Sequence, residues 1–216
     1  QMKNSLKAVS ASILAAAMLT PTAQAEITAN VALTTDYVWR GVSQNQEDPA
    51  LQGGFDYAHE SGFYVGTWGS NVNFGGASTE LDIYAGWSTE LESGLGLDFG
   101  IIEYTYHGSD VASDLNFTEY YASVSFAGFG AIYSVGDELD DQWEVSYGYD
   151  FENGLSLAAA YGDYTLGDDY QYMSIGGSME VGGIGLDLTY YTTDTEAVDD
   201  IPDTDDRLVF TISKEF

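Results

Sequence analysis

WEVSYGYDFENG, residues 143–154, is the stretch of sequence that decides the fold class. From Trp143 to Phe151, apolar or aromatic side chains alternate with polar or small ones, which is the period of a β-strand with one apolar face. Asn153-Gly154 then supplies a tight turn in which glycine adopts a positive φ. Similar units recur along residues 26–216, so the sequence predicts a series of antiparallel hairpins.

The connections between the twelve predicted strands alternate in character. Five are short turns, at residues 60–62, 92–94, 127–128, 152–154 and 182–183. Six are longer and polar, around residues 43–50, 72–79, 107–114, 136–141, 165–170 and 194–206. Five turns on the side of the termini and six loops on the other side are typical of outer-membrane barrels. We therefore predict an all-β, transmembrane antiparallel β-barrel of about 12 strands with both termini periplasmic.

A soluble β-sandwich would show the same two-residue period, so the aromatic residues are needed to choose between water and lipid. Along the predicted strands they form two bands around an aliphatic middle, as interfacial anchoring requires, although aromatic residues also favour strands in general. The band expected at the loop ends comprises Tyr37, Trp39, Trp68, Tyr104, Tyr106, Tyr120, Tyr121, Trp143, Tyr161, Tyr164, Tyr170, Tyr172, Tyr190 and Tyr191. The band expected at the turn ends comprises Phe63, Trp87, Phe126, Phe129, Tyr149, Phe151 and Phe216.

Both ends of the chain carry signals that agree with export to the outer membrane. Lys3 and Lys7 precede an apolar run at residues 8–19 and an Ala23-Gln24-Ala25 cleavage site, which predicts a signal peptide over residues 1–25, cleaved after Ala25. Residues 26–216 would form a single barrel domain in the outer membrane, in contact with lipid and lipopolysaccharide. The last segment, residues 208–216, ends on Phe216 and resembles the C-terminal strand signal read by the barrel-assembly machinery.

The composition excludes several classes of function. With 35 Asp and Glu against 5 Lys and Arg, the formal net charge is -30, and nucleic-acid binding would need clustered basic residues instead. The chain has no cysteine, which excludes disulfides and thiolate chemistry. Its 17 Tyr, 10 Phe and 4 Trp argue against a disordered acidic chain.

Strand parity predicts which charged side chains point into the barrel. The functional interpretation is a water-filled path that favours cations; the structural one is a filled barrel in which two arginines serve as counter-ions. Small residues at Gly86, Gly100, Gly148 and Gly162 favour open space. The predicted lumen-lining residues are Asp36, Arg40, Glu80, Asp82, Asp98, Glu119, Glu144, Asp150, Asp187 and Arg207.

The opening of the barrel also resembles a known family. Residues 30–44, continuing through 47–50 and 53–57, are similar to the start of the TorF-type family of proteins assigned as porins of proteobacterial outer membranes. Residues 62–68, 80–86 and 117–121 fit the same resemblance, which extends over residues 26–216. It implies an outer-membrane barrel, but the family has no defined set of functional residues, so no site is transferred.

Catalytic and metal sites are weakly supported by comparison. The available histidines are His59, at a predicted turn, and His107, at a predicted loop beside Ser109, Asp110 and Asp114, and a lone loop histidine is usually inert. We therefore predict no enzymatic activity and no cofactor.

The acidic loops could attract divalent cations, but they lack the spacing of a calcium-binding loop, and runs of like charge are usually solvated. We assign no metal site to them. The loop residues concerned are Asp137, Glu138, Asp140, Asp141, Asp194, Glu196, Asp199, Asp200, Asp203, Asp205 and Asp206.

Two functions of different class remain open at this point. The first is a diffusion channel for small solutes, with cations favoured. The alternative is a non-conducting structural or adhesive surface barrel that acts through its acidic loops. The sequence indicates neither the permeant solute nor the oligomeric state.

Overall fold

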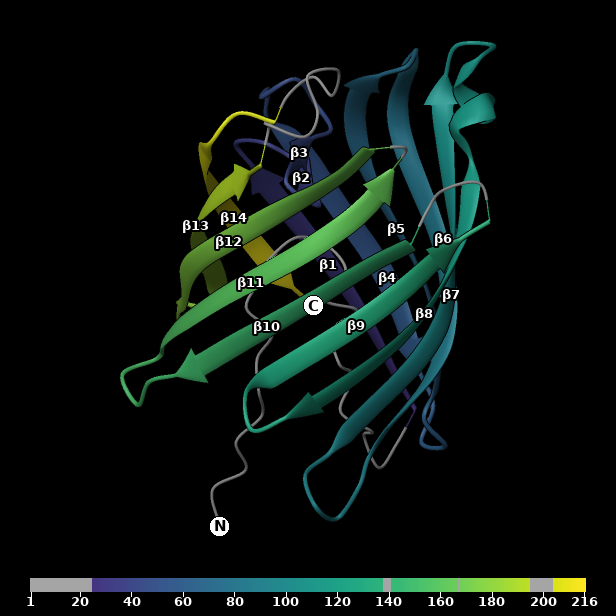
Figure 1. Cartoon of the computed structure of the whole chain (residues 1–216). Helices are drawn as coiled ribbons and strands as arrows, with labels where there is room; N and C mark the ends of the chain where they lie inside the picture. The colour runs from purple at the N-terminus through teal and green to yellow at the C-terminus, as the bar shows by residue number, and fades with distance from the viewer. Residues whose placement is uncertain (1–24, 138–140, 167, 195–203) are drawn as a thin grey trace.

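The structure is a computed structural model that describes residues 25–137, 141–166, 168–194 and 204–216. Twelve strands form one closed antiparallel barrel, in which each strand pairs with its neighbours along the chain and β1 pairs with β14 (Figure 1). The predicted antiparallel barrel of 12 strands is confirmed. The predicted signal peptide falls almost entirely on residues 1–24, which lie outside the described residues. The strands of the barrel are β1 (Glu26–Thr34), β4 (Ala50–Ala58), β5 (Phe63–Phe74), β6 (Ala77–Glu90), β7 (Gly96–Gly108), β8 (Phe117–Phe126), β9 (Phe129–Gly136), β10 (Asp141–Asp150), β11 (Leu155–Leu166), β12 (Asp168–Val181), β13 (Ile184–Thr193) and β14 (Arg207–Glu215).

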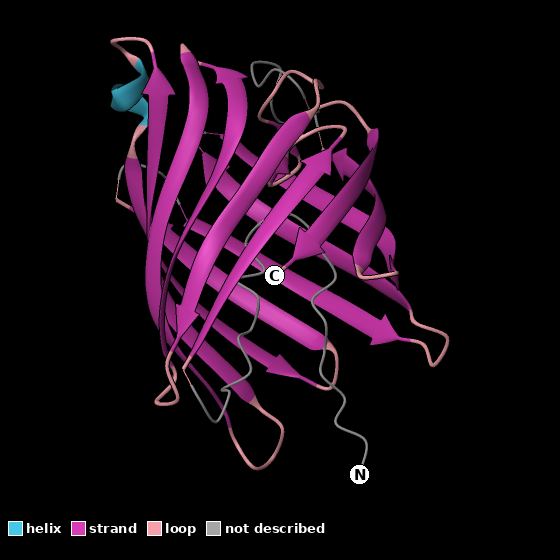
Figure 2. Ribbon diagram, turned by 180° about the vertical axis from the view of Figure 1, so that it is seen from behind, coloured by secondary structure: helices cyan, strands magenta, loops and turns pink. Residues whose placement is uncertain are grey.

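Backbone hydrogen bonds close the barrel between its first and last strands. Ala29 and Phe216 exchange N–H to O bonds of 3.2 and 2.8 Å, next to the register pair Asn30 and Glu215. Because β1 starts and β14 ends at the end of the barrel that carries the short turns, we call this the turn end and the opposite end the loop end. Figure 2 shows the tilted strands of the closed wall from behind.

The five short turns lie where the sequence predicts them, and each contains a residue with positive φ: Gly62, Gly94, Gly128, Gly154 and the pair Gly182 and Gly183. Two of the six expected long loops are wrong. Gly75 and Gly76 alone connect β5 to β6, and β11 and β12 extend through most of residues 165–170. Polar residues there continue the strand ladders, because ladder hydrogen bonds need no apolar face.

The outward face of the barrel is apolar. Ile27, Phe63 and Ile175 are 75%, 63% and 58% exposed, as expected of side chains that contact lipid rather than a second protein layer. No helix among the described residues is long and apolar enough to cross a membrane.

The predicted aromatic band is confirmed at the turn end for six of its seven members, which are exposed; Trp87 is half-buried. At the loop end the prediction is largely wrong. Tyr120, Trp143, Tyr161 and Tyr190 are exposed, whereas Trp39 and Trp68 are half-buried and eight tyrosines are buried. Height along a strand does not determine on which side of the wall a ring lies, since neighbouring positions face opposite ways. The buried tyrosines are Tyr37, Tyr104, Tyr106, Tyr121, Tyr164, Tyr170, Tyr172 and Tyr191.

Candidate functional site

The segment between β1 and β4, residues 35–49, folds into the barrel at the loop end. Its centre is a two-stranded hairpin of β2 (Val38–Trp39) and β3 (Val42–Ser43), which we call the inward hairpin. Arg40 and Gly41 form its tip with φ of 47° and 83°, as a two-residue hairpin turn requires. Tyr37 and Arg40 are 1% and 6% exposed, so the segment lies inside the barrel rather than over it.

The tip of the inward hairpin reaches three separate strands of the wall. Arg40 Nη2 donates to Glu119 Oε2 of β8 at 2.5 Å, and the guanidinium lies 4.8 Å from the ring centre of Tyr164 on β11. Thr193 Oγ1 of β13 donates to the Gly41 carbonyl at 2.9 Å. The hairpin therefore spans the lumen, because β8 and β13 are not neighbours in the sheet.

The base of the segment is held by a second ion pair. Asp36 accepts hydrogen bonds from Ser43 Oγ at 2.7 Å and from Arg207 Nη1 of β14 at 2.9 Å. Arg207 Nη2 also lies 4.0 Å from Glu47 Oε1. Both carboxylate oxygens of Asp36 are thus satisfied, and the base is fixed to the strand that closes the barrel.

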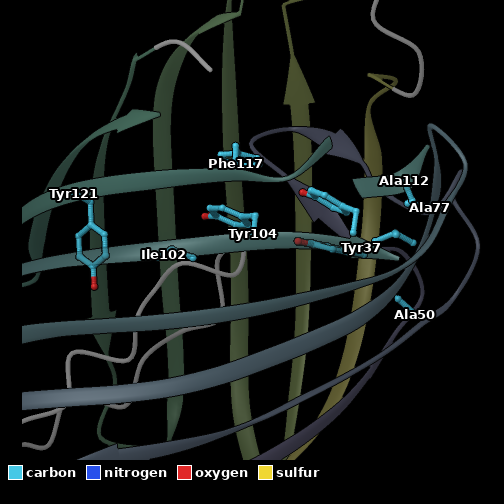
Figure 3. Close-up of a cluster of buried hydrophobic side chains, with 10 residues drawn as sticks. Tyr37, Ala50, Ala77, Ile102, Tyr104, Ala112, Phe117 and Tyr121 are labelled. Carbon is cyan, nitrogen blue, oxygen red and sulfur yellow. The ribbon is translucent and has the colours of Figure 1, made fainter. Parts of the chain in front are cut away.

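Aromatic side chains pack around the hairpin and fill the lumen at the loop end. Tyr104 and Phe117 stack with ring centres 4.3 Å apart, and Trp39 meets Tyr104 edge-on at 6.1 Å. Figure 3 shows Tyr37 entering this cluster opposite Tyr104 and Phe117. The hydroxyl of Tyr37 donates to Glu80 Oε1 at 3.1 Å, which joins the segment before the hairpin to β6.

Tyrosine rings lie over glycines of neighbouring strands along the inner wall. A Cβ atom at Gly100 would lie 2.5 Å from Tyr121, and one at Gly162 would lie 2.3 Å from Tyr172. A Cβ at Gly86 would meet the Tyr64 hydroxyl at 2.2 Å, whereas at Gly148 nothing approaches closer than 3.9 Å. The expectation that these glycines leave open space is therefore wrong at three of the four positions.

Phenols and carboxylates alternate around the middle of the barrel. Tyr64 donates to Asp98 Oδ1 at 2.7 Å and also contacts the Tyr121 hydroxyl, while Tyr84 donates to Asp56. These residues come from the five consecutive strands β4 to β8, so they form a continuous band over nearly half of the twelve-stranded wall. The alternating sequence indicates which side of the wall these tyrosines face, but only the register between strands shows that they meet the carboxylates.

The opposite wall becomes more accessible towards the turn end. On β10 the inward residues change from buried at Gln142, through half-buried at Glu144, Ser146 and Gly148, to exposed at Asp150. Serine, glycine and alanine dominate the same depth on β11 and β12. The lumen is thus filled at the loop end and less filled at the turn end on this side.

The structure brings some of the predicted lumen-lining residues together and leaves others apart. Two pairs form, Arg40 with Glu119 and Asp36 with Arg207. Glu80 and Asp82 lie side by side on β6, 1% and 5% exposed. The remaining four have phenol or hydroxyl donors as their described partners: Asp98 with Tyr64, Glu144 with Tyr172, Asp150 with Ser156, and Asp187 with Thr189.

The histidines do not belong to this interior cluster. His59 Nδ1 lies 2.7 Å from Ser61 Oγ in a turn, and His107 Nε2 lies 3.3 Å from Thr105 Oγ1 at the loop end of β7. Both side chains are exposed, and no contact joins His107 to the acidic residues that follow it in the sequence.

The acidic loop residues that the structure describes bind their own chain. Asp137 accepts from the Thr118 backbone N–H at 2.8 Å. Hydrogen bonds from Thr192 and Tyr190 lower the pKa of Asp206. In residues 25–137, 141–166, 168–194 and 204–216, no group of three or more His, Asp or Glu side chains could hold a metal ion. Glu138, Asp140 and the acidic residues from 196 to 203 lie outside these ranges.

Comparison with known proteins supports the fold. A family model described as "Bacterial protein of unknown function (Gcw_chp)" matches residues 18–216, so the more specific TorF name is not confirmed. The solved "KdgM porin" superposes with a TM-score of 0.61 at 6% identity, covering 88% of this chain and 98% of that one. The "NanC porin" superposes with a TM-score of 0.56 at 10% identity, covering 87% and 98%. No curated protein matches the sequence. The barrel therefore has the fold of outer-membrane porins.

Proposed function

The chain belongs to the Gcw_chp family of bacterial proteins of unknown function, and for it we propose passive diffusion of small solutes across the outer membrane, with cations favoured. The closed wall with an apolar outer face supports the membrane location. We orient the barrel with its turn end, including both termini, towards the periplasm. Its loop end, where the inward hairpin lies, then faces the outside of the cell. Residues 1–25 would serve as the cleaved signal peptide.

The charge of the interior supports the preference for cations and is the observation that carries the proposal. Within the described residues the interior cations are Arg40 and Arg207, and each is paired with a carboxylate. Asp98 and Asp187 are held instead by uncharged donors, so no cation compensates their negative charge locally. Carboxylates that line a pore favour cations over anions.

The same charge argues against acidic sugars as solutes. A structure similar to this chain in fold was solved as "KdgM porin in complex with disordered oligogalacturonate", with a TM-score of 0.59 at 6% identity, covering 88% of this chain and 97% of that one. A lumen with paired arginines and several unpaired carboxylates would repel such a polyanion. The shared fold therefore does not extend to a shared solute class.

Single-channel recording of the purified protein in planar bilayers tests the channel. We expect discrete conductance steps and, under a potassium chloride gradient, a reversal potential shifted towards that of potassium. Steps with a reversal potential towards chloride would overturn the preference for cations. A bilayer that stays silent over long recordings, with protein shown to be inserted, would overturn the channel itself.

The second candidate is a non-conducting structural or adhesive barrel, and the filled loop end favours it. Aromatic packing around the inward hairpin leaves little space on that side of the lumen. Both candidates share the partners proposed from the sequence, namely outer-membrane lipid, lipopolysaccharide and the barrel-assembly machinery. Adhesion of cells that display the protein, in the absence of conductance, would favour this candidate.

A further inference from the structure

We propose that the inward hairpin is a gate, whose tip leaves the wall of the barrel to open a path at the loop end. This inference rests on the proposed channel function. It assigns the closed state to the contacts of Arg40 and Gly41, and the hinge to the base of the segment at Asp36.

The base and the tip of the segment differ in how well their polar groups are satisfied. At the base, Asp36 uses both carboxylate oxygens, and Asn45 donates to two backbone carbonyls, of Asp48 and Pro49. Such groups remain in place, because breaking their bonds would leave buried charge or amide unpaired.

The polar groups where the tip meets the wall, which we call the seat, are much less satisfied by hydrogen bonds. Arg40 and Glu119 share one short bond, although arginine and carboxylate can form two parallel ones. Arg40 Nη1, Glu119 Oε1, Trp39 Nε1 and the Tyr104 hydroxyl are buried without a hydrogen-bond partner. Each such group costs free energy in the closed state and would regain a partner in water. The closed position of the tip is therefore favoured by only a small difference in free energy.

Backbone strain lies in the same segment. Four described non-glycine residues have positive φ, and three of them, Arg40, Gln46 and Glu47, belong to residues 35–49. Residues held in this region persist only when their surroundings enforce it, and such strain is common in elements that switch between two states.

Displacement of the tip would open the lumen on one side only. Trp39 and Arg40 would leave Tyr164 and Glu119, and the space between β8 and β11 would join the more accessible wall of β10 and β11 below it. A solute that enters there would meet Glu119, freed from Arg40, and then Glu144. The gate would thus expose carboxylates as it opens, in agreement with a preference for cations.

A disulfide between the tip and the wall tests the gate, and the natural chain has no cysteine to interfere. A Cβ at Gly41 would lie 3.5 Å from Thr193 Cβ, within the range of about 3.5 to 4.5 Å that disulfides require. It would also lie 2.7 Å from Tyr172 Cβ, so the cross-linked tip must shift slightly away from β12. The protein carrying Gly41→Cys and Thr193→Cys would be recorded in bilayers after oxidation and again after reduction. Gly41→Cys alone is the matched control, since it introduces the same bulk and the same strain at positive φ.

The expected result is loss of conductance in the oxidised pair and its recovery on reduction, with no response to either reagent in the single variant. Equal conductance of the oxidised and reduced pair, with the disulfide verified by mass spectrometry, would overturn the gate and leave the channel intact. Silence of every protein, the natural chain included, would overturn the channel and the gate with it.

A second variant tests the gate without adding bulk at the tip. Arg40→Gln together with Glu119→Gln removes the ion pair without leaving a lone buried charge. We expect the ratio of open to closed barrels to rise about tenfold, the lower end of what a hydrogen bond between charged groups contributes. An unchanged ratio would show that the pair does not hold the closed state, and would overturn the proposed latch.

Discussion

Arg40 Nη2 lies 2.5 Å from Glu119 Oε2, and this bond joins the tip of a hairpin between β1 and β4 to a strand on another part of the barrel wall. The two residues are 79 positions apart in the sequence. Both side chains are more than nine-tenths buried, so the pair lies in the interior and not on the rim. The stability of the barrel, and the selectivity and opening that we propose for it, depend on how this interior is packed.

Removing one partner of this pair should cost more than removing both. Arg40→Ala leaves Glu119 buried and unpaired, which typically costs about 3 to 5 kcal/mol, and Glu119→Ala should cost a similar amount. The double variant should lose clearly less than the sum. Urea unfolding in lipid vesicles measures this, with Glu60→Gln in an exposed turn as the control. Additive losses would show that the two charges are not coupled.

Because the Tyr121 ring packs closely over Gly100, we expect substitution of that glycine to destabilise the barrel. Gly100→Ala forces a methyl group to within 2.5 Å of the ring, and overpacking of this kind costs about 1 to 3 kcal/mol. Gly148→Ala is the matched control, because no atom lies within 3.9 Å of its Cβ position. The control should keep or slightly raise the free energy of unfolding. Similar losses of unfolding free energy in both variants would contradict this close packing.

Neutralising the acidic side chains of the inner wall should weaken the preference for cations. The triple variant Glu80→Gln, Asp82→Asn and Asp98→Asn removes three buried carboxyl groups of β6 and β7. We expect its reversal potential to move towards zero under a salt gradient. A triple variant of Asp137, Asp205 and Asp206 to asparagine, at the loop end, controls for total charge. A reversal potential equal to that of the natural chain would remove the first three residues from the conducting path.

A charge placed on the outer face should be costly only within the apolar band. Leu188 on β13 is 48% exposed and pairs with Gly177 and Phe210, so Leu188→Arg would place a cation among apolar groups. The expected loss is about 2 to 4 kcal/mol if the site lies near the middle of the bilayer. His107→Arg, at the polar end of β7, should change little. Equal tolerance of both substitutions in vesicles would contradict the lipid contact.

The terminal phenylalanine should matter for assembly more than for stability. Phe216 is 72% exposed, and its main-chain atoms bond to Ala29 while its ring lies 5.8 Å from Lys214 Nζ. Phe216→Ala keeps the main-chain bonds but removes the proposed recognition element. We expect less heat-modifiable protein in the outer membrane, with unchanged refolding in vitro; equal amounts in the membrane would refute the recognition role.

The local pattern was enough for the wall of the barrel. Alternation along residues 143–151 and the glycines at positive φ, such as Gly154 and Gly94, specify strands and turns through neighbouring residues alone. Strand parity likewise predicted that Glu80, Asp82 and Asp98 lie on the inward side. Where β5 continues to Phe74, the prediction failed because polarity was taken as the end of a strand, while pairing with β6 continues beyond the apolar band.

The inward hairpin was not predicted from the sequence. Parity along the first predicted strand placed Asp36 and Arg40 on its inward face, and the loop was expected only from about residue 43, whereas β1 ends at Thr34 and β2 and β3 follow. The position of the hairpin depends on Glu119, Tyr164 and Thr193, which are distant in the sequence and reach the tip only after the barrel closes.

The sequence alone thus determined a closed, acidic β-barrel with an apolar outer face. The two-residue period and the tight turns are local properties that do not depend on how the rest of the chain is arranged. Tertiary structure decided what fills the barrel. Which tyrosines cover which glycines, and which carboxylate meets Arg40, follow from the register between strands and from closure of β1 on β14, and these relationships do not exist until the chain is folded.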